Sequence, residues 1–313
     1  MSRAVVVESF GGPEVLDVRE VPEPHAGPGQ LRVRVTAAGL NPMDWILIGN
    51  EQVASAFGLS LPAGFGSDYA GVVDEVGEGV TGFAVGDRLY GGVLGRAVAD
   101  YVTVEPSRDE VHHTPEGVDD ITASTLVVAG KTADAALAAI GIGSGAGNGD
   151  GNKETVLIGG AAGGVGVFAV QLARLAGARV IGTASEASFD FLRGLGAEPV
   201  AYGDGLADRV RKLAPEGITA ATDLFGTETA YAALELGVSA DRVSTIAARD
   251  PELKAKATGG KDAAPGALEH IADLIAEGRV TVPIAATYPI DRIRDAVTFQ
   301  SARHANGKVV ITL

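Results

Sequence analysis

The stretch that decides the fold is Val156-Leu-Ile-Gly-Gly-Ala-Ala-Gly-Gly-Val-Gly166. An apolar run ends in a cluster of glycines, and an amphipathic segment, Val167–Ala176, follows directly. This order predicts a β-strand, a tight turn and a helix. Glycines in the turn would let a pyrophosphate approach the free N–H groups at the helix N-terminus. The three elements together favour a dinucleotide site over an ordinary glycine-rich turn of a parallel sheet.

The spacing of the glycines defines the expected contacts. The usual G-x-G-x-x-G pattern maps onto Ala161, Gly163 and Gly166, so alanine takes the place of the first glycine. We expect Gly163 to allow the close approach of phosphate and Gly166 to let the helix pack against the strand. The predicted cofactor contacts in this turn are Ala161, Gly163, Gly164, Val165 and Gly166.

A second strand, Arg179–Ala184, and a helix, Phe189–Leu195, which ends at Gly196, are expected to follow. The end of this strand indicates which nicotinamide cofactor is bound. An Asp or Glu there would bind the ribose 2′-hydroxyl of NAD and repel the 2′-phosphate of NADP. This place falls near Ala184, with Ser185 beside it, and no carboxylate occupies it, although Glu186 lies close by and no Arg or Lys occurs between residues 180 and 192. The sequence therefore favours NADPH because a repelling group is absent, with Ser185 as a donor to the 2′-phosphate.

Composition narrows the class of protein. A chain of 313 residues suits two domains, and 46% hydrophobic residues with 44 glycines are typical of a globular α/β protein. The net charge of −15 argues against nucleic acid or an anionic membrane as partner. No apolar run is long enough to cross a bilayer and no targeting signal is visible, so we expect a cytoplasmic location. The chain has no cysteine, which excludes disulfides and thiolate ligands.

The pattern of elements changes along the chain. The first part is rich in short alternating strands, expected at Ala4–Val7, Gln30–Ala38, Gly71–Val76 and Tyr101–Val104. From about Ser124, helices alternate with apolar strands, as in a parallel sheet. We expect Gly141–Gly151 to be a surface loop and the C-terminal strands to rejoin the first domain. A cleft between the two domains is the default ligand site.

Five blocks in a fixed order resemble one known family. They are Gly39-Leu-Asn-Pro-Met-Asp44, the block from Gly66-Ser-Asp-Tyr to Gly86-Asp-Arg, Gly130-Lys-Thr-Ala, the glycine turn, and Gly307-Lys-Val-Val. Together they resemble the medium-chain dehydrogenase/reductase superfamily, in its zinc-free quinone oxidoreductase (zeta-crystallin-like) branch.

The resemblance implies a fold and a chemistry. It implies an α/β chain with a GroES-like β-barrel domain, residues 1–123 completed by 280–313, and a Rossmann doubly wound parallel-sheet domain, residues 124–279. It also implies NADPH and the reduction of quinones or activated alkenes. In the zinc-dependent branch a cysteine stands at the place of Asn41, and the five histidines here show no ligand-like spacing, so we expect no metal.

Three residues are candidates for catalysis, each with a structural alternative. Asn41 follows a predicted strand, and in the similar family this residue lies near the nicotinamide, but Asn-Pro is also a common turn starter. Asp68 is an orienting carboxylate or a capping residue. Tyr69 is a proton donor, a stacking residue or simply a buried aromatic side chain.

Further cofactor contacts are implied by the resemblance. Thr132 resembles a cofactor-contacting threonine, although a helix-start hydroxyl would look the same. Tyr202 matches an aromatic residue beside the adenosine phosphate, or packs at an edge. The remaining expected contacts are Asn41, Ser185, Phe225 and Ala247, with Asp223 and Gly226 as a D-x-x-G element. Lys131 and Arg249 are candidates for phosphate contacts or solvated surface residues.

Two features depart from the family. Phe189 stands where relatives often carry a lysine, and Asp250–Pro265 is charged and rich in glycine and proline where a further apolar strand is usual. The second departure puts in doubt the last strand of the sheet and the homodimer edge that relatives build from it.

The sequence leaves three functions open. The first is hydride transfer from NADPH to a quinone or an electron-poor alkene, in which the protein mainly positions the reactants and excludes water. The second is an enoyl or alkenal reductase of lipid or polyketide metabolism. The third is a non-catalytic NADPH-binding sensor, which would bind the cofactor without turnover.

Overall fold

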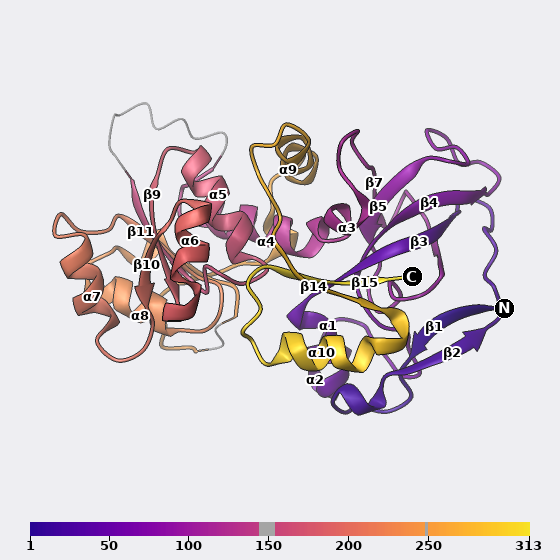
Figure 1. Cartoon of the computed structure of the whole chain (residues 1–313), viewed down its shortest axis with the longest axis horizontal. Coiled ribbons are helices and arrows are strands. Elements are labelled where there is room, and N and C mark those ends of the chain that lie inside the picture. Colours follow the sequence, from indigo (N-terminus) through magenta and orange to yellow (C-terminus); the bar gives the residue numbers. More distant parts are fainter. Residues whose placement is uncertain (144–153, 248–249) are drawn as a thin grey trace. The chain divides into compact units, whose positions relative to one another are not determined.

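The protein consists of two compact units (Figure 1). The computed structural model describes residues 1–143, 154–247 and 250–313. The first unit contains residues 1–128, 269–279 and 284–313, and the second contains residues 129–268 and 280–283. Most of the expected loop Gly141–Gly151 and the candidate Arg249 lie outside the described residues.

In this division residues 124–128 and 269–279 belong to the first unit, and residues 280–283 belong to the second. The sequence pattern assigns helix α9 (Ala267–Ala276) to the second domain, but from Glu269 onward it belongs to the first unit. Its Glu269 Oε1 lies 3.3 Å from Nδ1 of His112, in strand β7 (Glu110–His113). The helix is therefore tied to the β-rich part of the chain by a polar contact that the sequence pattern does not reveal.

The first unit is built around β3 (Leu31–Leu40), which is antiparallel to β15, β4 and β6, whereas β14 is parallel to β15. Strand β3 pairs with three neighbours, and the larger sheet runs in the order β14-β15-β3-β4-β5-β7 with β6 added beside β3. A separate two-stranded sheet joins β1 and β2. The bounds are β1 Ser2–Val6, β2 Asp17–Val21, β4 Asp68–Val76, β5 Arg88–Gly92, β6 Tyr101–Val104, β14 Ile284–Pro289 and β15 Lys308–Thr312. The C-terminal strand β15 thus pairs directly with β3, as expected.

Strand β3 explains where this unit can hold polar groups. In its first half, buried and more exposed side chains alternate, with Leu31, Val33 and Val35 buried and Arg34 exposed, as in a sheet with one solvent-exposed face. Its last four residues, Ala37 to Leu40, are buried on both faces. Polar residues that follow Leu40 are therefore enclosed by protein and must find internal partners.

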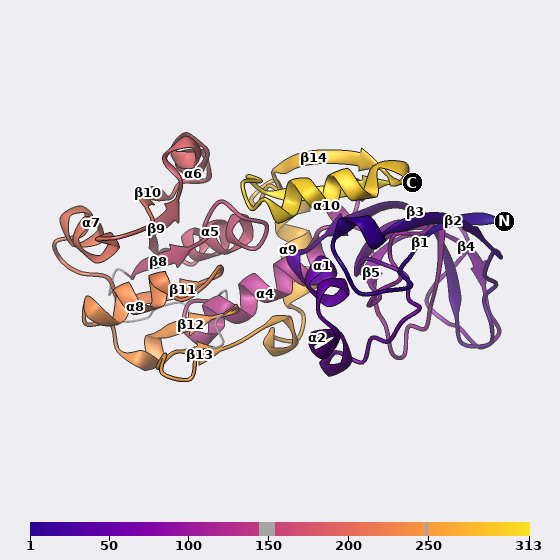
Figure 2. The ribbon, with the colours of Figure 1, turned by 90° about the horizontal axis from the view of Figure 1, so that it is seen from below.

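The second unit is a six-stranded parallel sheet (Figure 2). Its order is β10-β9-β8-β11-β12-β13, so the chain reverses direction across the sheet between β8 and β11. In doubly wound sheets this reversal marks the ligand site, at the carboxyl ends of the strands. The bounds are β8 Thr155–Gly159, β9 Arg179–Ala184, β10 Glu198–Ala201, β11 Ala220–Asp223, β12 Val243–Thr245 and β13 Lys256–Ala257.

Helices cover both faces of this sheet. Figure 2 shows α7 and α8 on one side of the strands and α4 and α5 on the other. On the first side, Leu157, Ile181 and Val243 of the strands share a core with Val210 of α7 and Ala230 of α8. The bounds in this unit are α5 Gly166–Leu175, α6 Phe189–Leu195, α7 Leu206–Leu213 and α8 Glu228–Glu235. The other helices are α1 Pro42–Gly49, α2 Glu51–Ala56, α3 Asp120–Ala123, α4 Leu126–Ala139 and α10 Ile293–Ser301.

The last strand of the parallel sheet, which the composition of Asp250–Pro265 put in doubt, is present but very short. Strand β13 has only two residues, both exposed, and pairs in parallel with β12 through Ser244–Lys256 and Thr245–Ala257. The charged, glycine-rich composition of Asp250–Pro265 limits the strand because it supplies no apolar side chains to bury.

Candidate functional site

The predicted strand, turn and helix are present as β8, residues 160–165 and α5. The sharp bend is made by Gly160, whose φ is +66°, a value that favours glycine. This explains why alanine is tolerated at the first motif position: Ala161 follows the bend, and its N–H donates to Thr183 O at 3.2 Å. The methyl group of Ala161 is fully buried and faces Gly182 of the neighbouring strand.

The turn has the shape of a cradle for an anion. A Cβ on Gly166 would lie 2.4 Å from Gly160 O and 2.5 Å from Ala161 O, so a side chain cannot enter without moving the backbone. Within the described part of the chain, the N–H groups of Gly164, Val165 and Gly166 have no hydrogen-bond partner. Free N–H groups at the first turn of a ten-residue helix are the donor set that a pyrophosphate requires.

The turn after β11 closes the other side of this cradle. A Cβ on Gly160 would lie 3.1 Å from Cβ of Phe225, whose side chain is 57% exposed. Phe225 is held by Asp223, a buried residue that accepts from the N–H groups of Phe225 and Gly226 through Oδ1. Its Oδ2 accepts from the N–H groups of Thr229 and Ala230 at the start of α8. The D-x-x-G element is thus a rigid turn at the carboxyl end of β11.

The two residues expected beside the phosphate of the adenosine end, Ser185 and Tyr202, lie at the ends of neighbouring strands. Ser185 directly follows β9, and its Oγ is 3.3 Å from Oγ of Ser188. Tyr202 directly follows β10, and its ring is 53% exposed. Strands β9 and β10 are parallel neighbours with Ala184 opposite Ala201, so both residues lie at the same edge of the sheet.

Two further expected contacts have different settings. Thr132 lies inside α4, which begins at Leu126, so the alternative of a helix-start hydroxyl is wrong. Its side chain is nearly buried, and its Oγ1 would lie 3.4 Å from a Cβ on Gly260. Ala247 follows β12 and is exposed. Lys131, the neighbouring candidate, is half-buried in α4 and stays a prediction.

A second constellation lies in the first unit, where β3 ends and α1 begins. The side chains of Asn41, Asp68 and Lys308 are all at most 2% exposed. Asn41 Nδ2 donates to Asp68 Oδ2 at 3.0 Å, and Lys308 Nζ donates to Asn41 Oδ1 at 2.6 Å. Strand pairing sets this geometry, because Gly39 lies opposite Asp68 and Leu40 lies opposite Val309. The structure therefore joins the two predicted polar residues to a buried lysine that the sequence pattern does not reveal.

Asp44 completes the cluster. It is the third residue of α1, and its Oδ2 accepts from the N–H of Asn41 at 2.8 Å, while Oδ1 accepts from Ser67 Oγ at 2.6 Å. Asp44 therefore caps the helix in a capping box with Asn41, and the Asn41 side chain also joins Asp68 and Lys308. The alternative interpretation of Asn41 as a turn residue accounts for its backbone position but not for its side chain.

Burial changes the pKa values in this cluster. Loss of hydration raises the pKa of Asp68 to about 7, and Lys308 and Asn41 oppose that rise. Loss of hydration likewise raises the pKa of Asp44 to about 6, against the hydrogen bond from Ser67. Burial lowers the pKa of Lys308, although both carboxylates favour its charged form. The cluster can therefore take up or release a proton near neutral pH, which is typical of functional sites.

The raised pKa of Asp68 predicts a pH-dependent stability. Between pH about 4 and about 7 the folded state holds a proton that the unfolded state has lost, so this group makes the protein less stable as pH rises. As the pH rises from about 4 to about 7, we expect the free energy of unfolding of Asp68→Asn to increase relative to that of the wild type by about 2–4 kcal/mol in total. Urea unfolding at several pH values measures it, and a constant difference would contradict the assigned pKa.

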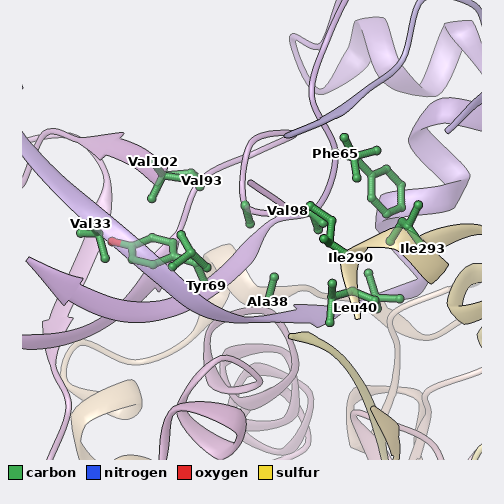
Figure 3. Close-up of a cluster of buried hydrophobic side chains, with 14 of the residues drawn as sticks. Val33, Ala38, Leu40, Phe65, Tyr69, Val93, Val98, Val102, Ile290 and Ile293 are labelled. Carbon is green, nitrogen blue, oxygen red and sulfur yellow. The ribbon is translucent and has the colours of Figure 1, made fainter. Parts of the chain in front are cut away.

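Tyr69, the third predicted catalytic residue, is in the hydrophobic core. Adjacent residues of a strand point to opposite faces, so Asp68 faces Asn41 while Tyr69 faces the other way. Figure 3 shows the Tyr69 ring among Val33, Val93 and Val102. The side chain is fully buried, and its hydroxyl has no hydrogen-bond partner within the part of the chain that the structure describes. This setting favours buried packing over proton donation, and burial raises the pKa of Tyr69.

Replacing the Tyr69 hydroxyl separates these two interpretations. We expect Tyr69→Phe to keep full turnover and to raise the free energy of unfolding by about 1 kcal/mol, because it removes an unsatisfied buried hydroxyl. Denaturant unfolding and steady-state rates provide the measurement. A loss of turnover beyond about tenfold would indicate that Tyr69 is a proton donor in the reaction.

The described residues show neither a metal centre nor a membrane span. Among residues 1–143, 154–247 and 250–313, no group of three His, Cys, Asp or Glu side chains is arranged to hold a metal ion. His112 lies between Glu110 and Glu269 and stacks on Tyr90. In the same described ranges, no helix has the length and apolar character that crossing a bilayer requires.

Comparison with known families agrees with this architecture. Residues 27–169 match the family model of the alcohol dehydrogenase GroES-like domain, and residues 164–265 match that of the zinc-binding dehydrogenase. The two matches together cover most of the chain and both units. The chain belongs to the medium-chain dehydrogenase/reductase superfamily, in its quinone oxidoreductase branch. The predicted fold class, a GroES-like domain with a Rossmann parallel sheet, is confirmed.

Individual relatives and solved structures also resemble this chain. The chain is 36% identical over 187 residues to a quinone oxidoreductase of Pseudomonas aeruginosa, a match that covers 59% of this chain and spans about half, 53%, of that relative. It is 33% identical over 93% of its length to a segment that makes up 8% of the pikromycin polyketide synthase component PikAII of Streptomyces venezuelae. The solved quinone oxidoreductase of Coxiella burnetii is 26% identical with a TM-score of 0.84, over 100% of this chain and 99% of that one.

Proposed function

We propose that this protein is an NADPH-dependent, zinc-independent oxidoreductase that reduces quinones or activated alkenes. The observation that carries the proposal is the cradle at residues 160–166, where three backbone N–H groups are free and a Cβ would collide with the backbone. Membership of the quinone oxidoreductase branch supports the same conclusion. When bound, NADPH supplies a hydride, which quinones accept readily without a Lewis acid.

The residues of the second unit would bind the cofactor. The N–H groups of Gly164, Val165 and Gly166 would bind the pyrophosphate at the start of α5. Ser185 would donate to the 2′-phosphate, and Tyr202 would cover the adenosine end. The exposed ring of Phe225 would exclude water beside the phosphates. Thr132 and Ala247 are the remaining proposed contacts in this unit.

The cluster of Asn41 and Asp68 would serve the reacting end of the cofactor. A buried amide held between charged groups keeps one orientation, which is what positioning a carboxamide or carbonyl requires. A zinc-independent reaction is consistent with this donor set, because the chain has no cysteine and its cluster contains two carboxylates, an amide and an amine.

Turnover with two substrate panels tests the proposal. NADPH oxidation is followed optically with benzo-, naphtho- and phenanthrenequinone, and in parallel with alkenals and enoyl thioesters. We expect the wild type to oxidise NADPH with members of the quinone panel. Tight NADPH binding without turnover of either panel would instead identify a non-catalytic binding protein.

Similarity to a polyketide synthase segment favours a second candidate, alkene reduction in polyketide or lipid assembly. The same residues would bind the cofactor, so only the ratio of rates separates the candidates. A kcat/KM for enoyl thioesters that exceeds the best quinone by about tenfold would favour the second candidate.

Cofactor preference has its own test at Ser185. We expect Ser185→Asp to lower kcat/KM for NADPH by about tenfold or more relative to NADH, because a carboxylate at the end of β9 repels the 2′-phosphate and accepts from a 2′-hydroxyl. Ala187→Asp adds the same charge two residues on, at an exposed position, and serves as the control. An equal effect of both changes would show a general charge effect and would contradict a specific contact at Ser185.

A further inference from the structure

Lys308 is a buried cation at the start of the last strand. Its side chain is 2% exposed, whereas lysine is almost never fully buried unless it is paired. Nζ donates to Leu40 O at 3.0 Å and to Asn41 Oδ1 at 2.6 Å. Both acceptors lie where β3 turns into α1, so one ammonium group joins the C-terminal strand to the junction that carries Asn41.

The position of Lys308 determines how the Asn41 amide must be turned. An ammonium group only donates hydrogen bonds, and a carboxylate only accepts them. Asn41 Oδ1 faces Lys308 Nζ, and Asn41 Nδ2 faces Asp68 Oδ2. The reversed amide would place its NH2 group against the ammonium and its oxygen against the carboxylate. The ammonium group therefore decides the orientation of the amide, which turns the NH2 group toward Asp68.

The neighbouring backbone is fixed by the same interactions. The Leu40 carbonyl accepts from Lys308 Nζ and also from Gln300 Nε2, at 2.9 Å. Gln300 in turn accepts from Nε1 of Trp45, which belongs to α1. The Asp68 carboxylate is held on its other side by the N–H of Val128, at 3.2 Å. The cluster is thus anchored to β15, α10 and α1 and has little freedom to rearrange.

We propose that Lys308 is a positioning residue for the reaction, which fixes the Asn41 amide and, through it, the Asp68 carboxylate in one arrangement. The inference rests on the proposed function, because it assumes that Asn41 and Asp68 serve the reacting end of the cofactor. Lys308 itself acts only through these two side chains.

Lys308→Met tests the proposal because it keeps the length of the side chain and removes its donor. We expect kcat to fall by about tenfold to hundredfold, while the KM for NADPH changes by less than about threefold. Lys212→Met, at an exposed position of α7, makes the same chemical change away from the cluster and is expected to leave both constants unchanged. An unchanged kcat in Lys308→Met would overturn the proposal while the proposed function stands.

A second readout does not depend on turnover. In protein with isotope-labelled asparagine side chains, the two Asn41 amide protons should give separate, slowly exchanging NMR signals, assigned from their loss in Asn41→Asp. We expect these signals to shift together or broaden in Lys308→Met. Unchanged signals would overturn the proposal even if the wild type reduces neither substrate panel, so failure of the function and failure of the inference remain distinguishable.

The removal of one buried charge could prevent folding, so a paired variant completes the test. Lys308→Met combined with Asp68→Asn leaves one buried carboxylate, Asp44, in place of the three charged groups. We expect this double variant to fold but to show Asn41 amide signals that are broader than those of Asp68→Asn alone. Identical signals in the two proteins would contradict a positioning role for Lys308.

Discussion

Gly166→Val is expected to abolish measurable NADPH binding, with an increase in the dissociation constant of about a hundredfold or more, equivalent to about 3 kcal/mol. The reason is steric, because a Cβ at this position would lie 2.4 Å from Gly160 O and 2.5 Å from Ala161 O. These are backbone atoms of the cradle itself, so the turn must open and its free N–H groups must separate. Fluorescence titration with NADPH measures the effect.

The matched control is Gly194→Val. It places the same side chain in α6, where a Cβ would meet nothing within 4 Å. We expect this variant to bind NADPH as the wild type does, and circular dichroism should show that both variants are folded. If Gly166→Val binds NADPH as tightly as Gly194→Val, the cofactor does not use this turn.

Asp223→Ala is expected to cause the largest loss of stability, about 3–5 kcal/mol in the free energy of unfolding. The buried carboxylate accepts hydrogen bonds from four N–H groups, those of Phe225, Gly226, Thr229 and Ala230. Alanine leaves these donors unsatisfied at the start of α8 and loosens the turn that carries Phe225. Urea unfolding gives the stability, and a parallel NADPH titration should show weaker binding.

Asp190→Ala is the control for a lost carboxylate. Asp190 pairs with Arg193 on the surface of α6, where its side chain is 97% exposed. Exposed ion pairs contribute little to stability, so we expect almost no change. A loss in Asp223→Ala no greater than in this control would show that the four hydrogen bonds do not hold the turn.

The second unit is largely predictable from sequence. Strand β9 and helix α6 have the expected bounds, Arg179–Ala184 and Phe189–Leu195. The helix ends where expected because Gly196 adopts a φ of 83°, which side chains disfavour. Signals of this kind, an apolar run and a glycine, lie in neighbouring residues and can be recognised without knowledge of the fold. For the same reason the glycine turn can be located from its own residues and those that flank it.

The cluster in the first unit is only half predictable. Asn41 and Asp68 lie 27 residues apart, and Lys308 is 267 residues from Asn41, so only strand pairing brings the three together. A lysine next to an apolar strand is ordinarily exposed, and nothing local indicates that Lys308 is buried. Asp44 is visible as part of a family block, but its capping role depends on the exact start of α1.

Tyr69 illustrates the limit of sequence reasoning at a single position. Its neighbour Asp68 faces the polar cluster, and the alternation of strand β4 then turns Tyr69 into the core. A shift of one residue in the pairing of β4 with β3 would exchange the two faces. Only the observed register, with Gly39 opposite Asp68, decides which of the two side chains is available for chemistry.

Calorimetric titration of the wild type with NADPH and with NADH tests the central claim most directly. We predict one NADPH bound per chain, about tenfold or more tighter than NADH, because the free backbone amides receive the pyrophosphate of either coenzyme and Ser185 donates to the 2′-phosphate that NADH lacks. The absence of binding heat with both coenzymes would contradict the account, since the bend at Gly160 would then hold no dinucleotide.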